Sequence, residues 1–161
     1  TGHLVLSTIH TNSATGVIPR LIDMGIDPFL IGPTLILAMA QRLTLELCPK
    51  SGTPIPVEGG IKIMIEKQFS DLPKQYLDEI EFTKEVYKAD PSADCPNGTR
   101  GRIAVMEVME MDKDLESVIL KNANELEIAK IARAKGMLTM KEDALIKAMN
   151  RVIPFEEANM L

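Results

Sequence analysis

The stretch TGHLVLSTIHTN, residues 1–12, decides the fold that we predict for this chain. Its apolar run Leu4–Ile9 includes β-branched residues suited to a pleated sheet, so it predicts a strand. The polar turn His10-Thr11-Asn12 follows it. In α/β folds, ligands bind just beyond the carboxyl ends of strands, where loop residues can reach them. If the fold is α/β, as we expect, the location of this turn fits a functional site.

The two histidines near the ends of this stretch, His3 and His10, raise the question of a metal site. Seven strand steps of roughly 3.3 Å would separate them by about 23 Å, and alternation would turn them to opposite faces. They cannot share one zinc ion. Two interpretations stay open at this point: structural residues at a strand edge and in a turn, or members of a functional site.

Motifs along nearly the whole chain resemble one family. They are TGHLVLSTIHTN followed by SATGVIPRLIDMG, AQRL at 40–43, LCP at 47–49, CPNGTRGRIAVMEVMEM at 95–111 and GMLTMKEDALIKAMNRVIPFEEANML at 136–161. In this order they are similar to the secretion ATPases, the hexameric motors of type II secretion and of type IV pilus assembly or retraction. The resemblance implies the last part of a RecA-like P-loop ATPase core that uses ATP and Mg²⁺.

The resemblance also implies roles for individual residues. His10 and His3 would form a histidine box that responds to the terminal phosphate of the nucleotide. Arg102 and Glu107 match a recurring pattern of the family that suggests a buried or interfacial polar pair. The alternative is a solvated arginine at a strand edge, since the guanidinium suits either setting. Arg42, in AQRL, is a further candidate for an interface or for coupling between subunits.

A phosphate-binding loop of the form GxxxxGK[ST] does not occur in the 161 residues. A P-loop enzyme needs that loop to hold the nucleotide phosphates and magnesium. We therefore expect this chain to be the C-terminal part of a longer ATPase and to be inactive alone. A competing interpretation is a non-catalytic interaction or oligomerisation module of a secretion or pilus system. A small metal-binding regulator is a third interpretation, weakened by the loss of ligands described below.

Composition narrows the partners. A net charge of −5 and the absence of tryptophan argue against a nucleic-acid-binding surface. The apolar run 28–40 is shorter than a bilayer span, which argues against direct membrane insertion. The resemblance implies a hexamer in the cytoplasm, associated peripherally with the inner membrane through a platform protein.

Three segments are expected, namely 1–47 as the end of the RecA-like core, 48–99 as an inserted lobe and 100–161 as a strand with a C-terminal helical bundle. Caps and periodicity predict the elements within them. The expected helices run from Asn12 or Ser13 to Gly25, from Pro28 to about Leu47, from Pro73 to Glu85, from Asn124 to Gly136, from Thr139 to about Met149, and in a short turn after Pro154. The expected strands are Leu4–Ile9, the alternating apolar residues of 61–69, and the stretch around Val105 and Val108.

The inserted lobe departs from the family at its cysteines. Many members carry a tetracysteine zinc site built from two CxxC pairs, of which Cys48 and Cys95 remain here. Ser51 and Gly98 occupy the second positions of the pairs. Two thiolates cannot complete a tetrahedral zinc site, so no zinc is predicted. The resemblance places both cysteines near each other, but a reducing cytosol disfavours a disulfide between them.

Overall fold

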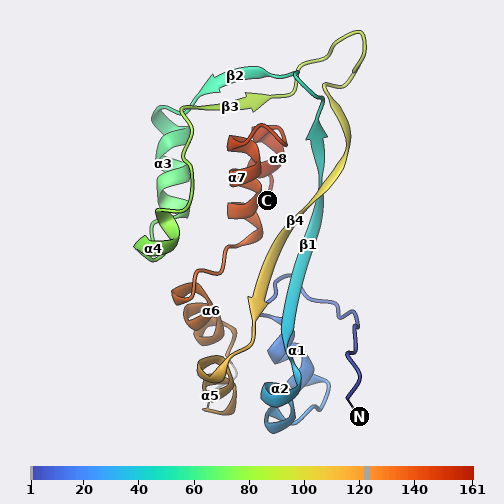
Figure 1. Ribbon diagram of the computed structural model, residues 1–161, viewed down its shortest axis with the longest axis vertical. Coiled ribbons are helices and arrows are strands. Elements are labelled where there is room, and N and C mark those ends of the chain that lie inside the picture. Colours follow the sequence, from blue (N-terminus) through green and yellow to red (C-terminus); the bar gives the residue numbers. More distant parts are fainter. Residues whose placement is uncertain (1, 122–123) are drawn as a thin grey trace.

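The computed structural model describes residues 2–121 and 124–161 as two lobes joined by a long two-stranded ribbon (Figure 1). The strands pair only in antiparallel fashion in this part of the chain, β1 with β4 and β2 with β3. Because the described residues combine helices with these two small sheets, the fold is mixed α/β. In chain order its elements are α1 (Val17–Asp23), α2 (Pro28–Thr34), β1 (Leu37–Leu47), β2 (Thr53–Pro56), α3 (Gly59–Gln68), α4 (Lys74–Leu77), β3 (Glu85–Lys88), β4 (Thr99–Glu110), α5 (Lys113–Lys121), α6 (Glu125–Ala134), α7 (Met140–Met149) and α8 (Phe155–Asn159).

The long ribbon of β1 and β4 connects the two lobes and runs past both of them (Figure 1). Its register places Leu37 opposite Glu110 and Leu45 opposite Arg102. Because side chains alternate along a strand, one face of the ribbon packs on the lobes and the other faces outward. Buried residues such as Val105 lie on the packed face.

The lower lobe in Figure 1 consists of α1, α2, α5 and α6. Polar caps set its helix starts, since Asp27 accepts a hydrogen bond from the Phe29 N–H and Asn124 accepts one from the Leu126 N–H. The apolar sides of these helices and one end of the ribbon share a core. Its buried residues are Ala14, Val17, Ile18, Ile31, Ala38, Met109, Leu115, Ile119, Ile128 and Ala132.

The upper lobe contains β2, β3, α3, α4, α7 and α8. The predicted capping box at the start of α7 is confirmed, with reciprocal hydrogen bonds between Thr139 and Glu142. Met137 packs in the lower core and its neighbour Leu138 in the upper core, so the chain crosses between lobes at this point. The buried residues of the upper core are Ile65, Phe69, Leu72, Val105, Ala144, Leu145, Ala148, Ile153 and Ala158.

The predicted strand Leu4–Ile9 is not formed. Residues 2–11 carry no regular secondary structure, and Leu4, Val5 and Leu6 are 76–87% exposed. A strand needs a hydrogen-bonding neighbour, and the described residues place none beside this segment. The apolar pattern of Leu4–Ile9 therefore does not by itself produce a strand, because a strand also needs a sheet with which to pair.

The predicted helix from Pro28 to about Leu47 is wrong after its first two turns. Helix α2 ends at Thr34, the backbone of Leu35 is extended, and β1 begins at Leu37. Pro33 lacks the N–H that a continuing helix requires. The residues beyond it instead form a full ladder with β4, which satisfies their backbone groups.

The predicted strand through residues 61–69 is also wrong, because this segment is helix α3. Ile65 and Phe69, one helical turn apart, are each 2% exposed, whereas Ile63 is 66% exposed. The helix expected within Pro73–Glu85 is shorter than predicted and covers only α4.

The ends of α1 and α6 agree with the glycine signals in the sequence. Gly25 and Gly136 follow these helices with positive φ angles. The division into 1–47, 48–99 and 100–161 stays a prediction. Within it, β1 of the first segment and β4 of the third build one ribbon.

Candidate functional site

The turn that follows His10 is held by hydrogen bonds, whereas residues 2–8 before it are exposed. We name residues 11–16 the box turn. His10 is exposed, but Ile9 is partly buried and packs against the lower core. Within the box turn the Gly16 N–H donates to Ser13 Oγ at 3.0 Å. The imidazole of His10 is thus presented to solvent from a fixed base.

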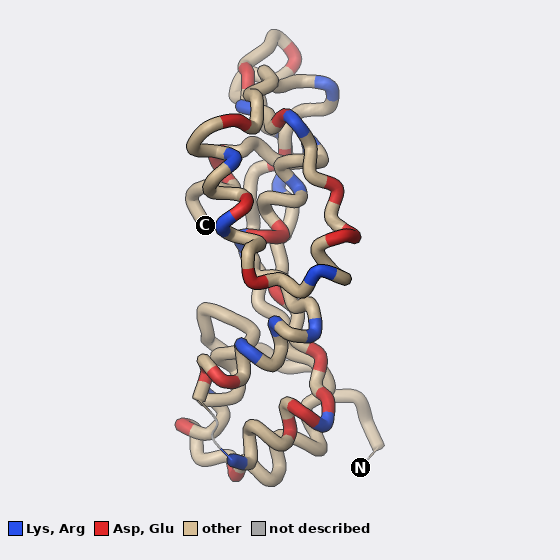
Figure 2. The backbone as a smooth tube through the Cα atoms, turned by 90° about the vertical axis from the view of Figure 1, so that its left-hand side faces the viewer, with Lys and Arg blue, Asp and Glu red and all other residues tan. Residues whose placement is uncertain are grey.

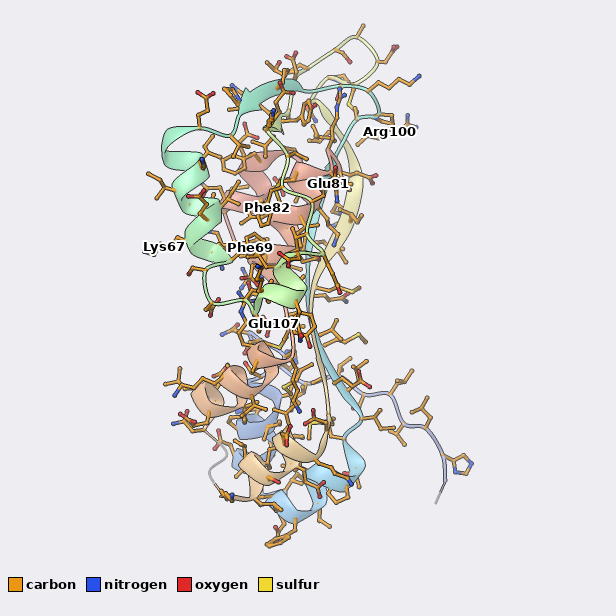
Figure 3. The ribbon with its side chains drawn as sticks, turned by 60° about the vertical axis from the view of Figure 1, so that its left-hand side comes forward. Lys67, Phe69, Glu81, Phe82, Arg100 and Glu107 are labelled. Atoms are coloured by element: carbon orange, nitrogen blue, oxygen red, sulfur yellow. A yellow bond between two sulfur atoms is a disulfide. The ribbon has the colours of Figure 1, made fainter. Side chains whose placement is uncertain are left out.

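Glu107 fixes the box turn from the ribbon. Its carboxylate is 6% exposed and its Oε1 accepts a hydrogen bond from the Ala14 N–H at 2.8 Å. Figure 3 shows Glu107 near the waist of the molecule, where the ribbon passes between the lobes. A buried carboxylate needs such a partner to offset its loss of hydration. Glu107 therefore has a structural role at the candidate site.

Glu125, the first residue of α6, fixes the box turn from the other side. Its Oε1 accepts from Ser13 Oγ at 2.5 Å and lies 3.1 Å from Thr15 Oγ1. The sequence does not reveal the role of this residue, because an acid after Asn124 signals only a helix start. Its partners lie 110 and 112 residues away, so no local signal could have identified them.

Within the described part of this chain, Arg102 and Glu107 do not pair with each other, and an interfacial role for either stays a prediction. These residues are five positions apart on one strand, so alternation turns their side chains to opposite faces of the ribbon. Arg102 lies opposite Leu45 on the outward face and is exposed. Arg42 is also exposed and lies opposite Val105. The structure gathers Glu107, but neither arginine, at the box turn.

His3 is exposed on the extended segment that precedes the box turn. Nothing in the described part of the chain tests a phosphate-sensing role for His3 or His10, so both assignments stay predictions. Likewise, no group of three or more histidine, cysteine, aspartate or glutamate side chains within 2–121 and 124–161 has the geometry to hold a metal ion.

Cys48 and Cys95 are joined by a disulfide, with Cα atoms 6.6 Å apart. Their expected proximity is confirmed, whereas the expectation that they remain reduced differs from the structure. At the two lost cysteine positions, Ser51 donates its hydroxyl to the Cys48 carbonyl and Gly98 has a φ of +70°. These groups do not fit a tetrahedral zinc ion, which prefers thiolate or imidazole ligands.

A cavity of about 500 Å³ lies in the upper lobe, between α3 and the segment leading into β3. The rings of Phe69 and Phe82 meet edge to face beside it, with centroids 5.4 Å apart (Figure 3). Most of its apolar walls belong to the upper core, whereas the box turn packs on the lower core. The apolar residues that line it are Val57, Ile65, Phe69, Leu77, Phe82 and Met149.

With this geometry in view, comparison with known proteins identifies the family. A model described as "Type II/IV secretion system protein" matches residues 1–160. The chain belongs to this family. The predicted resemblance to secretion ATPases is thereby confirmed at the level of the family.

Curated relatives of this type II/IV secretion system protein come from both pilus and secretion machines. The type IV pilus assembly ATPase PilB of Acinetobacter baylyi is 34% identical over 159 residues, which cover 99% of this chain and 26% of that protein. The PilB of Thermus thermophilus is 35% identical over 159 residues, 98% of this chain and 17% of that protein. The type II secretion system protein E of Xanthomonas campestris pv. campestris is 36% identical over 157 residues, 98% of this chain and 26% of that protein. The chain thus spans about a quarter or less of these relatives.

Two further properties of the chain concern its helices and its charged residues. No helix in the described ranges combines the length and the apolar character required to cross a bilayer. Acidic and basic residues are interspersed along both lobes in Figure 2.

Proposed function

We propose that this chain is the C-terminal part of a hexameric ATPase that hydrolyses ATP with Mg²⁺ to power type II secretion or type IV pilus assembly. The family match over residues 1–160 carries this proposal. It is supported by relatives whose names describe pilus assembly ATPases. Since the chain has no GxxxxGK[ST] loop, another part of the protein would supply the phosphate cradle and the magnesium ligand, and this chain alone would be inactive.

In this proposal His10, together with His3, responds to the terminal phosphate. An imidazole can donate a hydrogen bond to a phosphate oxygen and lose it when the phosphate departs. The firm base of His10 on the box turn supports this role, because movement at the imidazole would reach the lower core. The exposed guanidinium groups of Arg42 and Arg102 would contact neighbouring protomers in a hexamer.

The same proposal assigns the rest of the chain. Residues 1–47 would complete a RecA-like core. Residues 48–99 would form a lobe without zinc, and 100–161 would contribute a strand and a helical bundle. The motor would act in the cytoplasm on a platform protein at the inner membrane, without nucleic acid.

One observation favours a second candidate, a non-catalytic interaction or oligomerisation module. The outward face of the ribbon is rich in large apolar side chains that are 40–59% exposed. Contiguous exposed apolar surface of this kind marks sites of protein contact. The residues are Leu37, Met39, Leu43, Leu45, Met106 and Val108.

Magnesium-dependent ATP hydrolysis, measured for this chain beside a version extended upstream to include the parent's P-loop, tests the proposal. We expect no turnover from the chain alone and turnover from the extended version. In the extended protein, His10→Ala should lower kcat by about 100-fold, the scale of losing one donor that stabilises the transition state. Asp78→Ala, an exposed position in the upper lobe, is the control and should leave kcat unchanged.

Turnover by the 161-residue chain alone would contradict the proposed division of the active site. An extended, folded hexamer that does not hydrolyse ATP would favour the interaction module. Normal turnover by the His10→Ala variant would remove the histidine from the mechanism while leaving the motor assignment intact.

A further inference from the structure

Helix α6 contacts the box turn with one end and the upper lobe with the other. Glu125 is its first residue and Arg133 lies in its last turn. At a rise of about 1.5 Å per residue, these residues are separated by about 12 Å along the axis. Two charged anchors are thus mounted on one short rigid element, whose buried Ile128 and Ala132 fix it in the lower core.

The first anchor orients the box turn through hydroxyl groups. Glu125 Oε1 accepts from Ser13 Oγ at 2.5 Å, and that hydroxyl in turn accepts the Gly16 N–H at 3.0 Å. Space here is tight, since a Cβ on Gly16 would lie 2.9 Å from Ser13 Oγ and 3.3 Å from Glu125 Oε1. A displacement of Glu125 would therefore disturb the hydrogen bonds of the turn.

The second anchor grips the upper lobe through a guanidinium fork. Arg133 Nη2 lies 2.6 Å from Asp71 Oδ1, just after α3, and 2.6 Å from Glu142 Oε1 in α7. Its Nη1 donates to Glu142 Oε2 at 2.7 Å. The Arg133 side chain is 12% exposed and that of Glu142 is 1% exposed, so this contact is shielded from solvent. Beside it, the ring of Tyr76 lies against Gly136.

We propose that Glu125 is a positioning residue for the box turn and that α6 couples the place of this turn to the place of the upper lobe. The inference rests on the proposed function for its consequence, because it makes the upper lobe a regulator of how His10 is presented. Its physical basis is independent of nucleotide. A stiff helix held at both ends passes a displacement of Asp71 or Glu142 to Ser13 and Thr15.

Amide hydrogen exchange of the nucleotide-free 161-residue chain, resolved by NMR at Ala14 and Gly16, tests the first part. Glu125→Ala should speed exchange at Gly16 by about fivefold or more, the factor that corresponds to one hydrogen bond. Glu125→Gln keeps an oxygen acceptor and should restore exchange to within about twofold of the parent chain. Glu127→Ala removes a carboxylate from the same helical turn that forms an exposed ion pair with Lys130, and it should change nothing at Gly16.

The coupling is tested from the far end of α6. Asp71 is 71% exposed, so Asp71→Ala removes one partner of Arg133 without opening a core. It should speed exchange at Ala14 and Gly16 by at least about twofold, the lower end of effects transmitted through such contacts. Asp78→Ala, an equally small change on the surface of the same lobe, is the matched control. Arg133→Lys, which loses the fork but keeps the charge, should act in the same direction as Asp71→Ala.

Unchanged exchange at Gly16 in Glu125→Ala would overturn the positioning role. Faster exchange confined to the upper lobe in both Asp71→Ala and Arg133→Lys would overturn the coupling. Because these measurements use no nucleotide, they keep their meaning whether or not the extended protein hydrolyses ATP.

Discussion

At the scale of single residues, three carboxylates fix separate elements to one another, two of them across more than 90 residues of sequence. Glu107 holds Ala14, Glu125 holds Ser13, and Glu142 holds Arg133. The Glu107 and Glu142 side chains are nearly inaccessible to solvent and would be costly to bury without hydrogen-bond donors. The hydrogen bonds of these carboxylates contribute to the specificity of the fold, because they determine which backbone and side-chain groups contact one another.

The charge of the Arg133 guanidinium does not change over the pH range in which proteins are normally studied. Burial lowers the pKa of the Arg133 guanidinium, but hydrogen bonds to Glu142 and Asp71 outweigh it, so the pKa lies above its ordinary value. The charged arginine stabilises the folded state fully at a pH below its pKa in the unfolded chain. This stabilisation is lost as the pH rises through the higher pKa of the folded state. The ordinary pKa of arginine already lies far above neutral pH. The arginine therefore stays charged wherever the protein is normally studied.

Alanine substitutions at two glycines should shift the free energy of unfolding in opposite directions. Gly136 has a φ of +89°, and a Cβ there would lie 2.7 Å from ring atoms of Tyr76. Gly136→Ala should therefore lower the free energy of unfolding by about 1–3 kcal/mol, through backbone strain and the clash. Gly60, in the first turn of α3, has no atom within 4 Å of such a Cβ. Gly60→Ala should raise the free energy of unfolding by up to about 1 kcal/mol.

Urea unfolding of both variants beside the parent chain measures these shifts. Equal shifts of the same sign would contradict the conformations described for the two glycines.

At the scale of elements, the apolar stretches were the hardest to assign. Residues 37–47 and 59–68 are apolar at positions that satisfy a period of two as well as a helical period. The first became a strand because β4 lies beside it. The second became a helix that places Ile65, and Phe69 directly after its end, in the upper core. Contacts, rather than local preference, selected the element.

The helical state of α3 predicts unequal effects of two similar substitutions. Ile65 is 2% exposed, so Ile65→Ala should lower the free energy of unfolding by about 2–5 kcal/mol through lost burial and a cavity. Ile63 is 66% exposed, and Ile63→Ala should change it by no more than about 0.5 kcal/mol. Chemical denaturation followed by circular dichroism measures both. A strand would place the two side chains on one face, so equal losses would argue against the helix.

At the scale of the whole molecule, the lobes are connected by the ribbon, by the crossing at Met137 and Leu138, and by the contacts of Arg133. The Cys48–Cys95 disulfide acts at the far end of the ribbon. It encloses β2, α3, α4 and β3 within a sequence separation of 47 residues. A covalent link of this kind restricts the unfolded chain as a whole rather than one contact.

Reduction of this disulfide should therefore destabilise the chain. For a loop of this length the chain-entropy relation corresponds to about 4 kcal/mol, and strain or residual structure would reduce the effect. Thermal unfolding with and without dithiothreitol should show a lower Tm in the reductant. The double variant Cys48→Ser with Cys95→Ser is the control and should not respond to it. A parent chain with the same Tm in both conditions would show that the disulfide does not stabilise the fold.

The sequence by itself determined the family, the mixed α/β class and the helix ends whose signals are local. Asn124, Thr139 with Glu142, and Gly136 act within a few residues of the ends that they cap, so spacing alone revealed them. Only the tertiary structure decided that Leu37–Leu47 is a strand and that Leu4–Ile9 is not, because a strand exists only when a neighbour completes its hydrogen bonds. It also decided the partners of Glu107 and Glu125, which lie 93 to 112 residues away, since contacts at such distances depend on how the elements pack.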